Sequence, residues 1–158
     1  MINPEILTAI PFFKSFDLSS LEILARYLKP RDYWDGSIVF REGEPEEEMF
    51  FIRQGRVEVL WEISRNRKVI LASIGTGGLF GEMAVLMKSQ RAATILVVED
   101  LKVLFLSQAD FYRLLNDFPE TGFLVLKAIG RNLSNKLRAL NQHFLFAHST
   151  LTAQKPAN

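Results

Sequence analysis

The segment between Asp32 and Leu106 consists of short runs of apolar and β-branched residues that recur at fairly even spacing. Runs of this length favour antiparallel strands over helices. In the run from Val57 to Ile63, apolar side chains alternate with glutamates, as expected of a strand with one buried face. The expected strands are Ser37–Phe40, Met49–Arg53, Arg56–Ile63, Lys68–Ile74, Ala93–Val98 and Lys102–Leu106.

Residues that favour turns separate these runs. Glycine supplies positive φ angles, and Asn, Asp and Ser stabilise turns through their own side chains. We therefore expect hairpin connections between the strands, and seven or so antiparallel strands predict a barrel or a sandwich. The turn sequences are Asp35-Gly36, Gln54-Gly55, Ser64-Arg65-Asn66 and Glu99-Asp100.

Helical patterns flank the β-rich segment on both sides, which makes the predicted fold class α+β. Asn3 and Pro4 suit a helix start, and Ser19-Ser20-Leu21-Glu22 resembles a capping box. Ser107 with Asp110 forms a second capping pair, and Pro119 begins another helix. We expect one domain over 1–158, with helices in 1–29, strands in 30–106, helices in 107–148 and a fraying polar tail in 149–158.

The last expected helix carries an apolar stripe with the spacing of a coiled coil. Its residues recur at steps of 3, 4, 4, 3 and 4. Such a stripe either packs on the β-rich segment of the same chain or forms the seam of a homodimer. The stripe consists of Leu126, Ile129, Leu133, Leu137, Leu140 and Phe144.

Composition and charge exclude several classes of protein. The net charge is +1, with 19 basic and 18 acidic residues, so we expect no direct nucleic-acid binding. The chain has no cysteine, which excludes disulfides and thiolate metal sites and suits a cytoplasmic protein. Neither a signal peptide nor a run of about 18 apolar residues occurs, so we expect no membrane span.

One loop combines three ways of holding a small anion. Gly77-Gly78-Leu79-Phe80-Gly81 offers flexible backbone, and Glu82 begins an apolar run that reads as a short helix. Arg91 follows, and its guanidinium can fork onto two phosphate oxygens. These residue types predict a nucleotide-sized anion as the ligand.

The sequence Phe80-Gly81-Glu82-Met83-Ala84-Val85-Leu86, followed by Arg91-Ala92-Ala93-Thr94, closely resembles the phosphate-binding cassette of cyclic-nucleotide-binding domains. The similarity extends to the Arg41–Pro45 turn and to Phe51–Gly55, so it covers nearly the whole chain. It implies an antiparallel, jelly-roll-like β-roll with the cassette at 77–94. One departure is Glu46, where many relatives have glycine; the family places this loop away from the cassette, which implies little effect on binding.

The resemblance implies a role for each cassette residue. Arg91 would pair with the cyclic phosphate, and Glu82 would accept a hydrogen bond from the ribose 2′-hydroxyl beside Gly81. The cyclic phosphate carries one negative charge on two free oxygens, which matches a guanidinium fork. The remaining expected contacts come from Met83 and from backbone N–H groups near Ala84, Ala92 and Ala93.

Ala92 and the C-terminal helix bear on which base is bound and on what covers it. Relatives that favour cyclic GMP often have threonine after the cassette arginine, whereas Ala92 has no side-chain donor, which favours cyclic AMP. The family closes the pocket with its C-terminal helix. The residues whose spacing places them in range are Leu133, Lys136, Leu137 and Leu140.

The leading interpretation is a stand-alone, non-enzymatic cyclic-nucleotide receptor without a cofactor or metal. Ligand binding would move the C-terminal helix and signal through a homodimer over 126–144 or through an unidentified effector protein. One alternative is a fragment or relative of a transcription regulator of the catabolite-activator type, since too few residues follow position 148 for a helix-turn-helix module. A cupin-like metal enzyme is a distant alternative, because the only histidines, His143 and His148, lie outside the β-rich segment.

Overall fold

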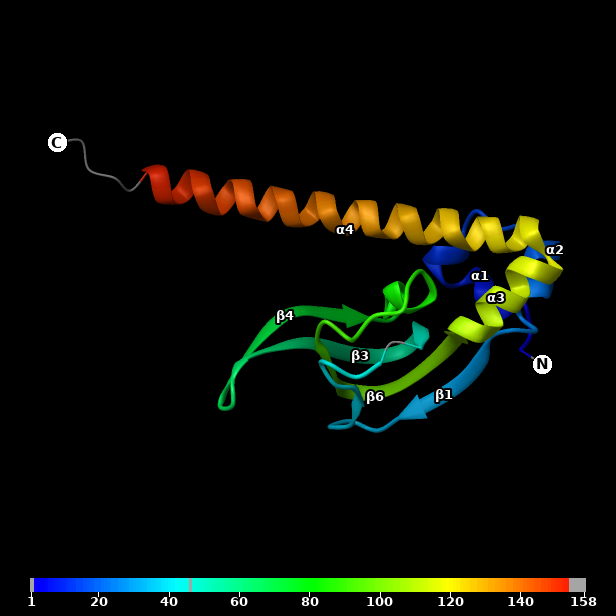
Figure 1. Cartoon of the computed structure of the whole chain (residues 1–158), viewed down its shortest axis with the longest axis horizontal. Helices are drawn as coiled ribbons and strands as arrows, with labels where there is room; N and C mark the ends of the chain where they lie inside the picture. Colours follow the sequence, from blue (N-terminus) through cyan, green and yellow to red (C-terminus); the bar gives the residue numbers. More distant parts are fainter. Residues whose placement is uncertain (1, 46, 154–158) are drawn as a thin grey trace. The chain divides into compact units, whose positions relative to one another are not determined.

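The computed structural model describes residues 2–45 and 47–153 (Figure 1). The chain divides into two compact units, Met1–Leu124 and Val125–Asn158, and the boundary falls inside the last helix. Since the two units are described separately, the expected single domain over 1–158 stays a prediction. Glu46 and the end of the expected tail, 154–158, lie outside the described residues.

The first unit contains an antiparallel sheet with the strand order β1-β6-β3-β4. Strand β2 also pairs with β6, and β5 pairs with β3. With helices before and after it, this sheet confirms the predicted α+β class and the antiparallel β-roll. The strands within the described residues are β1 (Lys29–Tyr33), β2 (Ile38–Phe40), β3 (Glu48–Ser64), β4 (Arg67–Gly75), β5 (Leu79–Phe80) and β6 (Thr94–Ser107).

Two of the expected hairpin turns are wrong, because each lies inside one long strand. Gln54-Gly55 falls within β3, and Glu99-Asp100 falls within β6. The two positions face each other, and the register shifts there between Gln54 and Arg56. Gly55 has φ +96°, and an added Cβ would lie 2.3 Å from the Asp100 carbonyl oxygen. The turn-forming residues therefore mark a shared bend in two paired strands rather than chain reversals.

An aromatic cluster fills the interior of the roll beside the predicted cassette. The Phe50 ring stacks on Phe80 with centroids 4.9 Å apart. Phe40 contacts both rings, at 6.0 Å and 5.9 Å, and Phe105 lies 6.3 Å from Phe50. Each such pair contributes about 0.5–1.5 kcal/mol beyond the area it buries. Because Phe80 directly precedes Gly81, this packing fixes where the cassette begins.

Three short helical segments precede the sheet: α1 (Glu5–Thr8), the 3-10 helix η1 (Pro11–Phe13) and α2 (Leu18–Leu24). The rings of Phe12 and Phe13 lie 5.0 Å and 4.8 Å from Phe51, which attaches η1 to β3. The predicted capping box at Ser19 is wrong, since the N-cap is Asp17, whose carboxylate accepts from the Ser20 N–H at 2.7 Å. Asp is as strong an N-cap as Ser, and Asp17 stands two residues before Ser19.

Helix α3 (Gln108–Asp117) begins at the predicted cap. The Ser107 hydroxyl accepts from the Asp110 N–H at 3.1 Å and donates to the Asp110 carboxylate at 2.8 Å. Burial raises the pKa of the Asp110 carboxyl, but hydrogen bonds from Ser107, Lys29 and Arg113 outweigh burial and leave that pKa below its usual range. The Lys29 contact, at 3.0 Å, ties the start of α3 to the start of β1.

Helix α4 (Pro119–Ala153) begins at the predicted residue and continues past the expected end at 148. Residues 149–153 are therefore helical, so the prediction of a fraying tail from residue 149 is wrong for these five residues. The hydroxyls of Ser149 and Thr150 both donate to the Phe146 carbonyl, at 2.8 Å and 2.9 Å, so these polar residues bond back to the preceding turn.

Candidate functional site

The predicted cassette, 77–94, runs from the turn before β5 to the first residue of β6. After Phe80 the chain passes through Gly81 in the left-handed conformation, with φ +73°. It then forms the 3-10 helix η2 (Glu82–Val85) and reaches Arg91 just before β6 begins. Glu82 and Arg91 are both buried, at 6% and 5% exposure, which is unusual for charged side chains.

The backbone of Arg91 is held by the turn that precedes β3. The Arg91 N–H donates to the Glu44 carbonyl at 2.8 Å, and the Gly43 N–H donates to the Arg91 carbonyl at 2.8 Å. The expectation that this turn lies away from the cassette is therefore wrong. Gly43 and Glu44 brace the arginine directly, whereas Glu46 in the same loop lies outside the described residues.

The side chain of Arg91 is also fixed in place. Its Nη2 donates to the Glu48 carbonyl oxygen at 2.8 Å, and its guanidinium carbon lies 3.8 Å from the centroid of the Phe40 ring. A cation this close to an aromatic face is attracted by the ring quadrupole. The guanidinium is thus oriented before any ligand arrives, which lowers the entropy that binding costs.

Glu48 is itself anchored by a second arginine. Its carboxylate accepts from Arg31 Nη1 at 2.7 Å and from Nη2 at 2.9 Å, a bidentate pair. The Arg31 guanidinium lies 3.9 Å from the Phe105 ring centroid. The Glu48 hydrogen bonds raise the pKa of Arg31 above its usual value, although partial burial opposes them. Arg31 therefore fixes Glu48, and the Glu48 carbonyl oxygen accepts the hydrogen bond from Arg91.

Gly81 lies directly against Arg91. An added Cβ at Gly81 would lie 2.8 Å from Arg91 Nη1 and 2.9 Å from the Glu48 carbonyl oxygen. Glycine is required here for two reasons: the positive φ, and the close approach of the guanidinium. The structure thus brings together Gly81, the adjoining Glu82 and Arg91, as the sequence predicts.

Gly81→Ala should lower the free energy of unfolding by about 1–3 kcal/mol more than Gly36→Ala does. Gly36 has φ +82° and nothing within 4 Å of an added Cβ, so it shares the conformational cost without the steric one. Urea denaturation of both variants measures the difference. Equal destabilisation would show that Arg91 is not packed against Gly81.

The other predicted contacts differ in exposure. Met83 and Ala92 are exposed and Ala93 is half-buried, so their backbone and side chains border an accessible surface. Ala84 is fully buried, and its carbonyl accepts from Gln108 Nε2 at 2.6 Å, which links η2 to α3. Sequence reasoning missed Phe40, Glu48 and Gln108, since only tertiary contacts reveal them.

The predicted lid residues stay a prediction. Leu133, Lys136, Leu137 and Leu140 belong to the second unit, which is described apart from the cassette. In α4, Leu133 is half-buried, while Lys136, Leu137 and Leu140 are exposed.

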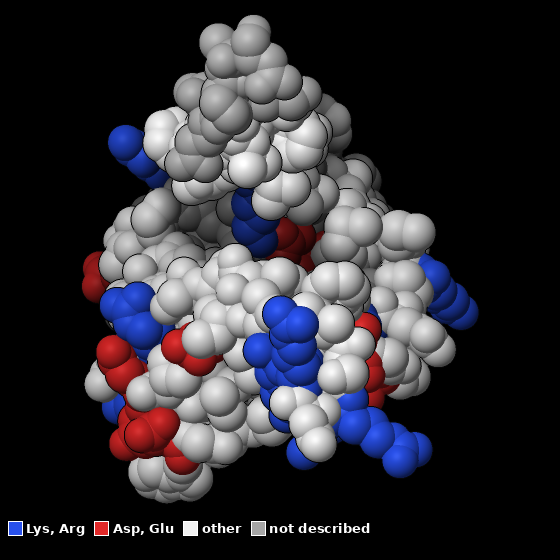
Figure 2. Space-filling model, turned by 90° about the vertical axis from the view of Figure 1, so that its left-hand side faces the viewer, with Lys and Arg blue, Asp and Glu red and all other residues white. Residues whose placement is uncertain are grey.

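Two further observations concern the surface charge and the possible metal ligands of the described residues. The face in Figure 2 carries basic and acidic side chains mixed with uncharged ones, in keeping with the net charge of +1. Among the described residues, no group of three or more His, Asp or Glu could hold a metal ion, and no helix is long and apolar enough to cross a membrane.

Comparison with known proteins agrees with this geometry. The family model described as the cyclic nucleotide-binding domain matches residues 30–118. A cyclic nucleotide-gated potassium channel of Rhizobium etli is 32% identical over 125 residues, which is 79% of this chain and 34% of the channel. A CRP-like cAMP-activated global transcriptional regulator of Mycobacterium tuberculosis is 25% identical over 82% of this chain and 58% of the regulator.

Among solved structures, the catabolite activator protein of Thermus thermophilus superimposes with a TM-score of 0.74 at 25% identity. The superposition covers 87% of this chain and 63% of that protein. This chain therefore spans about a third of the channel and somewhat more than half of the two regulators.

Proposed function

This chain belongs to the cyclic-nucleotide-binding domain family, and we propose that it is a non-enzymatic, cytoplasmic receptor for cyclic AMP. The observation that carries the proposal is the buried Arg91, oriented by Phe40 and Glu48 directly beside Gly81, the residue before Glu82. Its guanidinium would pair with the two free oxygens of the cyclic phosphate. Glu82 would accept the hydrogen bond of the ribose 2′-hydroxyl, which only a ribonucleotide can donate.

The fixed arginine suits binding better than turnover. A preorganised guanidinium recognises a monoanion, whereas hydrolysis of a cyclic phosphate needs an activated nucleophile. Glu82 is assigned to the ribose hydroxyl, and the other predicted contacts have no nucleophilic or basic side chain that could activate water: Gly81, Met83, Ala84, Ala92 and Ala93. We therefore expect cyclic AMP to be released unchanged.

Base selectivity should depend on Ala92, which is exposed beside Arg91 and has no side-chain hydrogen-bonding group. Cyclic AMP should bind more tightly than cyclic GMP. Ala92→Thr should improve the affinity for cyclic GMP relative to cyclic AMP by about tenfold, the effect of one added hydrogen bond. Calorimetric titration with both nucleotides measures the ratio, with Ala72→Thr on an exposed part of β4 as the control. Equal affinities for the unmodified protein would contradict the preference.

Helix α4 would transmit the binding of cyclic AMP to a partner. Within this helix Leu137, Leu140 and Phe144 are 60%, 71% and 72% exposed, so much of the predicted seam is available to a homodimer partner or to an effector protein. Exposed apolar side chains at this spacing favour a helical partner. A ligand can shift α4 only by binding one of its arrangements more tightly than the other.

Hydrogen exchange tests this switch. Saturating cyclic AMP should change the amide exchange rates of residues 119–146, and light scattering with and without ligand should report any change of oligomeric state. Unchanged exchange throughout α4 would contradict a switch through this helix, even if cyclic AMP binds.

A second candidate function is the sensory part of transcription control. Two similar proteins are regulators, a CRP-like cAMP-activated regulator and a catabolite activator protein. On this hypothesis the chain would act on a separate DNA-binding chain rather than on DNA itself. A mobility-shift assay of the protein alone and with candidate partners, each with cyclic AMP, separates the two possibilities.

A further inference from the structure

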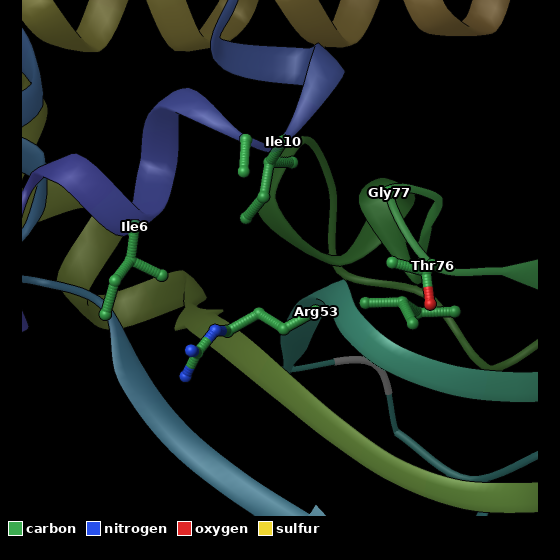
Figure 3. A pocket seen from close by; sticks show the side chains of 7 residues that line it. Ile6, Ile10, Arg53, Thr76 and Gly77 are labelled. Atoms are coloured by element: carbon green, nitrogen blue, oxygen red, sulfur yellow. The ribbon is translucent and has the colours of Figure 1, made fainter.

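A cavity of about 280 Å³ lies in the first unit, between α1 and the chain that connects β4 to β5. Figure 3 shows the Arg53 side chain reaching from β3 toward Ile6. Ile10 lies between Ile6 on one side of the cavity and Thr76 and Gly77 on the other. Pockets for drug-sized ligands usually hold about 300–1,000 Å³, so this cavity is suited to a small ligand.

The walls of the cavity are mostly apolar. Ile6, Ala9 and Ile10 line it from the N-terminal helical segment, and Ile52 lines it from β3. Ile10 and Ile52 are only 3% and 0% exposed, so Ile6 and Ala9 supply most of the accessible apolar surface of the cavity. Such walls gain from contact with hydrocarbon rather than with water.

One cation borders these apolar walls. Arg53 is exposed, and it forms no ion pair with any residue of 2–45 or 47–153. An exposed guanidinium without an ion pair can offer a fork of N–H donors to an incoming carboxylate. Apolar walls and one cation together complement a ligand that has a hydrocarbon chain and a single negative charge.

The floor of the cavity is held rigidly. The Gly77 N–H donates to the Ile52 carbonyl at 2.8 Å, and the Ile52 N–H donates to the Gly78 carbonyl at 2.9 Å. An added Cβ at Gly77 would lie 3.2 Å from Pro11 Cδ, so η1 packs closely on this backbone. The cavity is therefore a preformed feature, and its lining does not include Gly81, Glu82 or Arg91.

We propose that this cavity is a second ligand site that binds a small monocarboxylate with an unbranched alkyl chain. Arg53 binds the carboxylate, and the alkyl chain lies against Ile6 and Ala9. A carboxylate is expected rather than an ammonium group because Arg53 repels cations. Each buried methylene strengthens binding by about fourfold until the cavity is full.

The test is a titration of isotope-labelled full-length protein with butyrate, hexanoate and octanoate, followed by amide and methyl chemical shifts. Saturable shifts should appear at Ile6 and Ala9, with affinity rising along the series. Arg53→Gln should weaken octanoate binding about tenfold or more, the loss of a charge-assisted hydrogen bond. Arg67→Gln, which removes another exposed arginine at the start of β4, should leave binding unchanged.

Two further probes isolate the role of charge. Octanol has the chain without the anion, and octylammonium reverses the charge, so both should bind more weakly than octanoate. Equal octanoate affinity for Arg53→Gln and the unmodified protein would overturn the proposal, as would shifts confined to the exposed apolar residues of α4. No cyclic nucleotide is needed, so the result is independent of whether the cassette binds one.

Discussion

Replacing Arg91 with alanine is expected to weaken cyclic AMP binding by more than about 100-fold, because two charge-assisted hydrogen bonds to the phosphate are lost. Each such bond contributes about 1.5–3 kcal/mol. Arg91→Lys keeps the charge but loses the planar fork, so it should cost about tenfold. Isothermal titration calorimetry measures both variants.

Two controls separate recognition from folding in this experiment. Arg91 packs on Phe40 and bonds to the Glu48 carbonyl, so its removal also perturbs the interior of the roll. Circular dichroism and thermal unfolding must therefore show that each variant is folded. Arg67→Ala, at an exposed position, should bind like the unmodified protein. A folded Arg91→Ala protein that binds cyclic AMP within about threefold of the unmodified one would exclude Arg91 as the phosphate ligand.

Replacing Glu82 with alanine should weaken cyclic AMP binding by roughly 10- to 100-fold, the effect of one hydrogen bond to a charged acceptor. The ligand provides the matched comparison. The 2′-deoxy analogue of cyclic AMP lacks the hydroxyl that Glu82 is expected to bind, so its affinity should be nearly equal for Glu82→Ala and the unmodified protein.

This ligand comparison is sharper than the substitution alone. Glu82 is 6% exposed, so its removal could loosen η2 and weaken binding of every nucleotide alike. Glu22→Ala, on the exposed side of α2, controls for the loss of one negative charge. If Glu82→Ala weakened both ligands by the same factor, the carboxylate would be a structural group and not the ribose acceptor.

Local sequence patterns predicted those features of the fold that depend on neighbouring residues. Ser107 and Asp110 form the expected cap, and α4 starts at Pro119, because capping and proline geometry act within one helical turn. The pattern failed at Gly55, where the sequence shows a glycine suited to a turn. Its actual role, close contact with Asp100 on a paired strand, depends on a partner that is distant in the sequence.

In the candidate site, too, the sequence predicted the residues of a local motif but not the distant residues that support them. Gly81, Glu82 and Arg91 were predicted because they occur in one contiguous, recognisable motif. Their support was not predicted, since the Arg91–Glu48 hydrogen bond joins residues 43 positions apart and the Phe40 ring comes from another strand. No local periodicity encodes such contacts, which arise only when β2, β3 and the cassette assemble.

The most direct test of the receptor assignment is a calorimetric titration of the unmodified protein with cyclic AMP. We predict saturable binding of one nucleotide per chain, and its loss in the folded Arg91→Ala protein. A folded, unmodified protein that gave no saturable binding of either cyclic AMP or cyclic GMP would contradict the proposed function.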